Sequence, residues 1–145
     1  MAIRNFRDLQ CWQVPNRRRG EVNAICSMPN VAKDFKFCSS FRDAIGSACR
    51  NISEGFTRGG SCEIVQFFTY SLASLAESQD HLVECRIRSV IDKEQFDRDW
   101  DLAEHTKATC KDFMKPHEER CRRQKPKNKK PPLPPDNQRW RPRST

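Results

Sequence analysis

The sequence predicts an all-α fold, an antiparallel up-down four-helix bundle over residues 1–119. Residues 120–145 follow as a basic, Pro-rich tail that we expect to be disordered. Three observations support this fold class. Four segments place apolar residues three and four apart, which is the spacing of an amphipathic helix. The links between these segments are short and favour antiparallel neighbours. No segment carries a convincing strand pattern.

The first helix is expected from about residue 8 to residue 27. Its apolar face consists of Leu9, Trp12, Val22, Ile25 and Cys26. The middle, Pro15–Gly20, is polar on every face, and a proline beyond the first turn of a helix removes a hydrogen bond and crowds the preceding turn. Two alternatives stay open: the helix begins after Pro15, or it is kinked there.

The second and third helices are joined by a short turn over residues 57–60. Gly55 is expected to end the second helix, which runs from about 39 to 54 with an apolar stripe of Phe41, Ile45, Ala48, Cys49 and Ile52. Ser61 is expected to cap the third helix, and Glu63 suits its first turn. This helix should reach about Arg88, with one face formed by Ile64, Phe67, Phe68, Ser71, Leu72, Leu75, Gln79, Leu82 and Cys85.

The fourth helix begins at Asp92, because Asp92-Lys-Glu-Gln95 is typical of a capping box. Pro116 should end or kink it, and residues 117–124 resume as a short polar helix. One side is lined by Phe96, Trp100, Ala103, Lys107, Cys110 and Met114. The acidic residues of this helix are expected to form a solvated face: Glu94, Asp97, Asp99, Asp101 and Glu104.

The positive charge of the chain is concentrated after residue 119. The formal net charge is +8, and residues 120–145 hold ten lysines and arginines against one acid, Asp136. Basic segments of this kind bind nucleic acid with a salt-dependent affinity. The alternative is a solvated tail that aids solubility. The candidate phosphate-binding residues are Arg120, Arg122, Arg123, Lys125, Lys127, Lys129, Lys130, Arg139, Arg141 and Arg143.

Further arginines and one tryptophan are candidates for the same interface. Trp140 lies between two arginines and would stack on an exposed base, or is a chance aromatic residue. Arg17, Arg18 and Arg19 either extend the basic surface or simply face solvent. Arg58 falls in the expected turn before the third helix, where a partner would reach it.

No motif in the sequence indicates an enzyme. The chain has no P-loop, no GxGxxG, no HExxH and no nucleophile elbow. Cys110, His117 and Cys121 fall roughly on one helical face, but Pro116 interrupts that face and zinc motifs usually place two ligands closer together. We therefore expect no catalytic residue, no metal and no cofactor.

The cysteine pattern and the hydropathy of the chain indicate its cellular compartment. None of the eight cysteines forms a CxxC pair. The first residues lack the apolar core of a secretory signal, and no apolar run approaches the roughly 18 residues of a membrane span. We expect a cytoplasmic protein without a membrane partner, in which the thiols are reduced. The even number of cysteines leaves disulfides open as an alternative.

Three stretches resemble a known family: Phe6–Gln13 (FRDLQCWQ), Arg42–Gly55 (RDAIGSACRNISEG) and Phe67–Glu77 (FFTYSLASLAE). In this order, over about residues 4–115, they resemble the four-helix-bundle proteins encoded in 23S rRNA intervening sequences. That family is similar to the accessory variability proteins of diversity-generating retroelements. The most specific elements are Asn-Ile-x-Glu-Gly at 51–55 and Ser-Leu-Ala-Glu at 74–77.

The resemblance implies a four-helix bundle without known enzymatic activity, which in several members assembles as a homopentameric ring. The retroelement relatives bind nucleic acid and a reverse transcriptase. Asn51, Glu54 and Gly55 carry the family motif, and we expect the first two to bond backbone amides around residues 58–61. The alternative role for these side chains is contact with a partner. The polar stretch Pro15–Gly20 and the basic tail depart from the family pattern.

Two functional hypotheses follow. The first is a non-enzymatic, homo-oligomeric scaffold that presents basic tails to nucleic acid, with RNA preferred to DNA. The second is a protein-interaction adaptor that docks on a reverse transcriptase or a ribosomal component, with Pro131–Pro135 as a docking segment. A salt-sensitive affinity for RNA would indicate the first, and a salt-insensitive protein partner the second.

Overall fold

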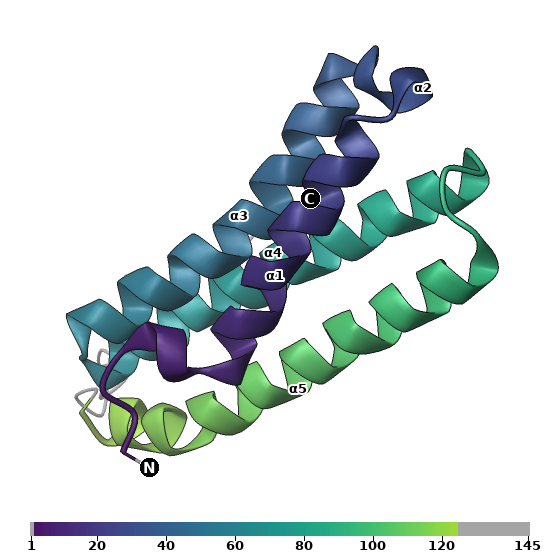
Figure 1. Cartoon of the computed structure of the whole chain (residues 1–145). Coiled ribbons are helices and arrows are strands. Elements are labelled where there is room, and N and C mark those ends of the chain that lie inside the picture. The colour runs from purple at the N-terminus through teal and green to yellow at the C-terminus, as the bar shows by residue number, and fades with distance from the viewer. Residues whose placement is uncertain (1, 125–145) are drawn as a thin grey trace, which may run out of the picture.

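The computed structural model describes residues 2–124, and within that range all regular structure is helical. Figure 1 shows four long helices joined by short links. The elements are the 3-10 helix η1 (Phe6–Asp8) and the α-helices α1 (Gln10–Cys26), α2 (Pro29–Ala32), α3 (Phe35–Arg58), α4 (Ser61–Ile87) and α5 (Lys93–Gln124).

The four long helices alternate in direction along the chain. α3 packs against α4, α4 against α5, and α1 closes the bundle by contacting both α3 and α5. Each long helix thus has two neighbours, and its apolar stripe is covered from both sides. The predicted antiparallel four-helix bundle is confirmed.

α1 runs without interruption through Pro15, so the expectation that the helix begins after this proline is wrong. Pro15 lies inside the helix and is buried with Cys11, Val14 and Val22, which are spaced along the same face. The proline has no N–H to donate to the carbonyl of Cys11. Burial of that face against α3 and α5 maintains the helix despite the missing hydrogen bond.

α3 is longer at both ends than the sequence pattern predicts. The Asp34 carboxylate caps its start by accepting a hydrogen bond from the Phe37 amide at 3.0 Å. Its end lies at Gly59, whose φ of 75° is the left-handed conformation that glycine adopts readily. Gly55 therefore does not end the helix. It lies inside α3, where a Cβ atom would come within 2.9 Å of the Phe67 Cβ on α4.

The caps of α4 and α5 differ partly from prediction. Gly60 occupies the N-cap position of α4, and Ser61 is the first helical residue. Asp92 does cap α5, because its Oδ1 accepts a hydrogen bond from the Gln95 amide at 2.7 Å. α5 continues through the exposed Pro116 to Gln124, so of the two predicted effects of this proline, an end to the helix is wrong. The predicted boundary between residues 119 and 120 falls within this helix.

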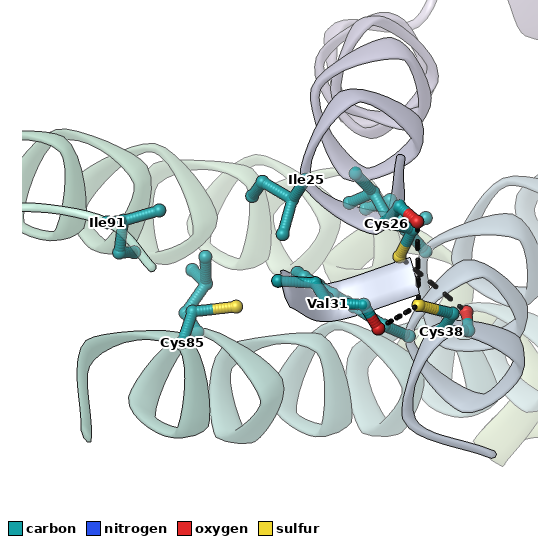
Figure 2. Packing of buried hydrophobic residues seen from close by; sticks show 10 residues of the cluster. Ile25, Cys26, Val31, Cys38, Cys85 and Ile91 are labelled. Atoms are coloured by element: carbon teal, nitrogen blue, oxygen red, sulfur yellow. Dashed lines mark hydrogen bonds between the residues drawn. The ribbon is translucent and has the colours of Figure 1, made fainter. Parts of the chain in front are cut away.

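The core forms two apolar clusters, one toward each end of the bundle. Figure 2 shows the first, in which α1, α2, α3, α4 and the link between α4 and α5 converge: Ile25, Cys26, Val31, Cys38, Cys85 and Ile91. The second is centred on Leu9, Ile52, Phe68, Cys110 and Met114. The cysteines in both clusters pack as small apolar side chains.

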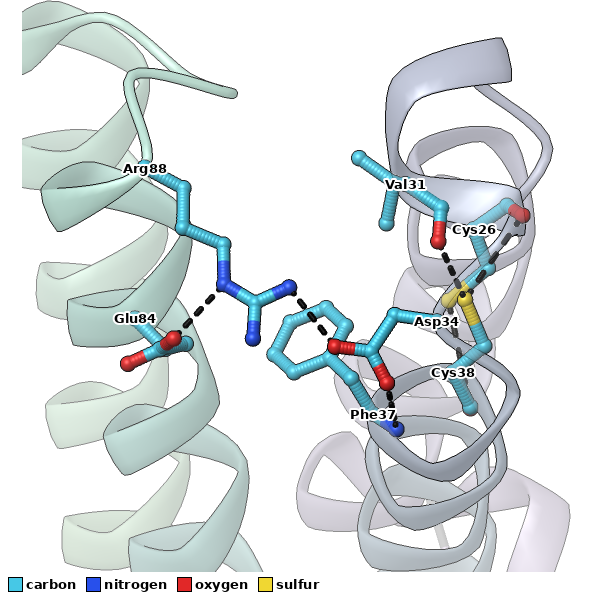
Figure 3. A network of polar contacts seen from close by, with 7 residues as sticks. All are labelled: Cys26, Val31, Asp34, Phe37, Cys38, Glu84 and Arg88. Carbon is cyan, nitrogen blue, oxygen red and sulfur yellow. Dashed lines mark hydrogen bonds and ion pairs between the residues drawn. The ribbon is translucent and has the colours of Figure 1, made fainter.

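A polar network links the start of α3 to the end of α4 outside the first cluster. Arg88 donates from Nε to Glu84 Oε1 at 2.6 Å and from Nη1 to Asp34 Oδ2 at 2.9 Å. Its guanidinium also lies 4.6 Å from the centre of the Phe37 ring (Figure 3). The phenyl face and the two carboxylates hold the Arg88 guanidinium in place. They thereby connect the start of α3 to the end of α4.

Candidate nucleic-acid interface

The last turn of α5 carries the described part of the predicted basic tail. Arg120, Arg122 and Arg123 are exposed and helical. Arg123 pairs with Glu119 one turn earlier. The remaining candidates lie outside the described residues: Lys125, Lys127, Lys129, Lys130, Arg139, Trp140, Arg141 and Arg143.

A disulfide fastens this basic end of α5 to the start of α4. Cys62 and Cys121 are bonded, with their Cα atoms 4.8 Å apart, so the expectation that all the thiols are reduced is wrong for this pair. The remaining cysteines are free and buried. The direction of the chain at Arg122 and Arg123 is thereby set by the bundle.

His117 makes a second contact between the same two helix ends. Its Nδ1 lies 3.2 Å from the Ser61 Oγ, and its ring lies beside Phe113. Burial lowers the pKa of His117 below its ordinary value, and the nearby positive charge of Arg120 lowers it further. A neutral imidazole is therefore favoured at this position.

The structure separates the three residues that were considered as metal ligands. Cys110 is buried against Cys11, which raises its pKa through their hydrogen bond and through burial. His117 faces Ser61, and Cys121 is bonded to Cys62. Within residues 2–124, no cluster of His, Cys, Asp or Glu side chains has the arrangement of a metal site.

The three consecutive arginines of α1 have three different environments. Arg17 is exposed, and Arg19 is partly buried and donates from Nη2 to the Gly46 carbonyl at 3.4 Å. Arg18 is buried, with 3% of its surface exposed, so it is not part of an accessible basic surface. It pairs with Asp99 of α5, and this buried carboxylate is the exception to the predicted solvated acidic face.

The family motif on α3 has a structural role that differs from the expected one. Asn51 donates from Nδ2 to the Ser47 carbonyl at 2.9 Å and lies 3.1 Å from the Ser47 Oγ. Glu54 accepts from Arg58 Nε at 2.7 Å. Neither side chain bonds the amides of the turn, because α3 extends through this segment. Gly55 allows α3 and α4 to approach closely.

Arg58 is the last residue of α3, where half of its side chain is exposed. Its guanidinium lies 5.0 Å from the centre of the Phe67 ring on α4. The carboxylate of Glu54 and the aromatic face together hold it at the α3–α4 turn. Arg58 remains accessible to a partner on its solvent side.

Sequence reasoning did not select Arg42 and Arg50 as candidate binding residues. Together with Arg19 they line a hollow of about 220 Å³ between α1 and α3. Arg42 and Arg50 are eight residues apart on α3, which places them on one helix face. That spacing was the available signal, but the contribution of α1 becomes visible only in the folded chain.

The described helices include none that is both long and apolar enough to cross a membrane. Comparison with curated proteins and with solved structures gives no match. A family model for the 23S rRNA-intervening sequence protein matches residues 7–111, which is well over half of the chain and includes the three motif stretches except for Phe6. The chain belongs to the 23S rRNA-intervening sequence protein family.

Proposed function

We propose that this protein is a non-enzymatic, RNA-associated scaffold whose basic C-terminal segment contacts the phosphate backbone. One observation carries the proposal. The exposed Arg120, Arg122 and Arg123 end α5, and the sequence after them adds seven lysines and arginines against Asp136. The association of the family with rRNA intervening sequences supports RNA as the nucleic acid.

The physical basis of this binding is the release of counterions. Each phosphate that a lysine or arginine neutralises frees a condensed cation, so affinity falls as salt rises. Contacts of this kind read the backbone and not the bases. A homo-oligomer, for which a ring of five is the family precedent, would present several basic segments at high effective concentration.

The test keeps the chain at full length. In the neutralised-tail chain, glutamine replaces the seven basic residues at positions 125, 127, 129, 130, 139, 141 and 143. Truncation at Glu119 would be less informative, because it also removes Cys121 and hence the disulfide. We expect the neutralised-tail chain to bind a fluorescein-labelled single-stranded RNA much more weakly than the unaltered chain. Equal affinities would contradict the proposal.

A second candidate function, a protein-interaction adaptor, is favoured by two exposed apolar side chains. Phe35 at the start of α3 is 83% exposed, and Ile87 at the end of α4 is 72% exposed. The Arg88–Asp34 ion pair brings these two helix ends together. These two apolar side chains would suit contact with another copy of the chain, a reverse transcriptase or a ribosomal component. If the protein is such an adaptor, Phe35→Ser/Ile87→Ser should lower the molecular mass of the oligomer in solution or abolish a salt-insensitive complex with the partner.

A further inference from the structure

A groove lined by arginines lies between α1 and α3, on the folded bundle and apart from the C-terminal segment. We define this arginine groove by Arg19 and Asn23 on α1 and by Arg42, Gly46 and Arg50 on α3. The α1 residues are one turn apart, and the α3 residues follow at successive spacings of four. Each helix therefore presents one row of side chains to the groove.

Gly46 lies in the groove next to Arg19 and Arg50. A Cβ atom at this position would lie 2.8 Å from Arg50 Nη1, so the Arg50 guanidinium lies directly over this glycine. Arg19 reaches the same residue from α1 and donates from Nη2 to its carbonyl at 3.4 Å. Both positive charges therefore lie next to Gly46.

Neighbouring polar groups orient the arginines without neutralising all of them. Asn23 Oδ1 accepts from Arg42 Nε at 2.9 Å, a neutral partner that leaves the Arg42 charge uncompensated. Arg50 Nη2 donates to Asp43 Oδ1 at 2.7 Å, and both of these side chains are largely exposed. Three arginines against one carboxylate leave the groove positively charged.

The groove continues in both directions along the bundle. Toward α2 it joins a larger hollow that also includes Arg42 and Arg50. Toward η1 it joins a hollow that shares Arg19 and Arg50 and includes the aromatic rings of Phe6 and Trp12. The acidic residue on that side, Glu54, is already paired with Arg58. The three hollows together have arginines in the middle and aromatic residues at both ends, Phe35 toward α2 and Phe6 and Trp12 toward η1.

We infer that the arginine groove binds the phosphates of a single-stranded RNA backbone. Guanidinium groups match phosphate oxygens with paired donors, and an adjacent aromatic ring can stack on a base. The aromatic residues beside the arginines favour RNA over an acidic peptide, because each base of a single strand offers a planar face for stacking. This site lies on the bundle itself, so it goes beyond the proposed role of the C-terminal segment and does not depend on it.

The test uses the full-length neutralised-tail chain, which keeps the arginine groove and lacks the seven basic residues after Gln124. Arg42→Gln/Arg50→Gln removes two exposed charges from the groove. The matched control, Arg86→Gln/Lys111→Gln, removes two exposed charges from α4 and α5. Affinity for a fluorescein-labelled oligouridylate is measured by anisotropy, and thermal unfolding verifies that each variant folds.

We expect the groove variant to bind about tenfold or more weakly than its parent, since charge-assisted hydrogen bonds are lost. The control should change affinity by less than about twofold, because scattered charges contribute only a screened, long-range effect. The inference is overturned if the neutralised-tail chain does not bind RNA, or if both variants lose affinity equally. Neither of these outcomes contradicts the proposed function of the C-terminal segment. If instead the neutralised-tail chain binds RNA as tightly as the unaltered chain, that function is contradicted and RNA binding by the groove is supported.

A second arm separates RNA from a small anion. NMR signals of the arginine Nε–H groups are followed during titration with the oligouridylate and, separately, with inorganic phosphate. Shifts of the Arg42 and Arg50 signals with RNA at much lower concentration than with phosphate support the inference. Shifts with phosphate and none with RNA would reassign the groove to a small phosphate ligand and overturn the RNA assignment.

Discussion

Arg18 of α1 donates a hydrogen bond from Nη1 to the backbone carbonyl of Asp99 on α5 at 2.9 Å, and its Nη2 lies 3.7 Å from the Asp99 carboxylate. Both residues are almost fully buried. Burial lowers the pKa of Arg18, and the Asp99 charge opposes that shift. This pair fixes α1 against α5, the helix that carries the described part of the basic segment.

Removing the Asp99 charge should strongly destabilise the bundle. Asp99→Asn removes the buried counter-charge of Arg18 and leaves only the half-exposed Glu21 carboxylate, 3.8 Å from Arg18 Nε. We expect the free energy of unfolding to fall by about 3–5 kcal/mol. The control, Asp101→Asn, lies on the exposed side of the same helix and should change it by less than about 0.5 kcal/mol. Urea unfolding measures both. Similar losses in the two variants would show that the buried pair has no special role.

Two glycine substitutions should have opposite effects. In Gly55→Ala the new methyl group meets Phe67 and Phe68 of α4, and we expect a loss of about 1–3 kcal/mol in the free energy of unfolding. In Gly20→Ala nothing lies within 4 Å of the new methyl group, and we expect a gain of about 0.5–1 kcal/mol. Thermal unfolding monitored by circular dichroism distinguishes them. Equal stabilities would mean that α3 and α4 are not in close contact at Gly55.

The disulfide between Cys62 and Cys121 spans 59 residues of sequence and should stabilise the bundle. We expect Cys62→Ser to lower the free energy of unfolding by about 2–4 kcal/mol in non-reducing buffer. Dithiothreitol should bring the unaltered chain to the level of the variant and leave the variant unchanged. If the reductant has no effect on the unaltered chain, the two cysteines are thiols in solution.

Stability should fall in mild acid partly because of His117. Its pKa is lowered in the folded state by burial and by Arg120, so the unfolded chain binds this proton more readily. The contribution of His117 is therefore fully present above its ordinary pKa of about 6.5 and is lost as the pH falls below that value. Unfolding at pH 7.5 and 5.5 should show a smaller loss in His117→Gln than in the unaltered chain. The control is His105→Gln, at an exposed position, and an equal effect of the two variants would contradict this assignment.

The four long helices could be predicted because their apolar spacing is a local property of the sequence. The ends and interruptions could not, because packing against distant segments overrides local rules. Pro15 and Pro116 lie within helices that the bundle maintains, and Gly55 is a contact point whose neighbour Phe67 lies in the next helix. A glycine that ends a helix and one that admits a neighbouring helix have the same local sequence signal.

The candidate interface also has a part that the sequence predicts and a part that depends on the fold. The basic C-terminal segment was predictable because a run of charge is visible in the sequence. The burial of Arg18 was not, since its partner Asp99 is 81 residues away. Nor was the arginine groove, which brings Arg19 from α1 and Arg50 from α3 next to Gly46.

The most direct test of the RNA-scaffold account is the salt dependence of RNA affinity for the unaltered and neutralised-tail chains. The logarithm of the association constant is plotted against the logarithm of the salt concentration for each. With seven cations removed, the slope should become shallower by up to about 5, at about 0.7 per phosphate contact on single strands. Identical slopes would show that the C-terminal segment makes no phosphate contacts and would contradict its proposed role.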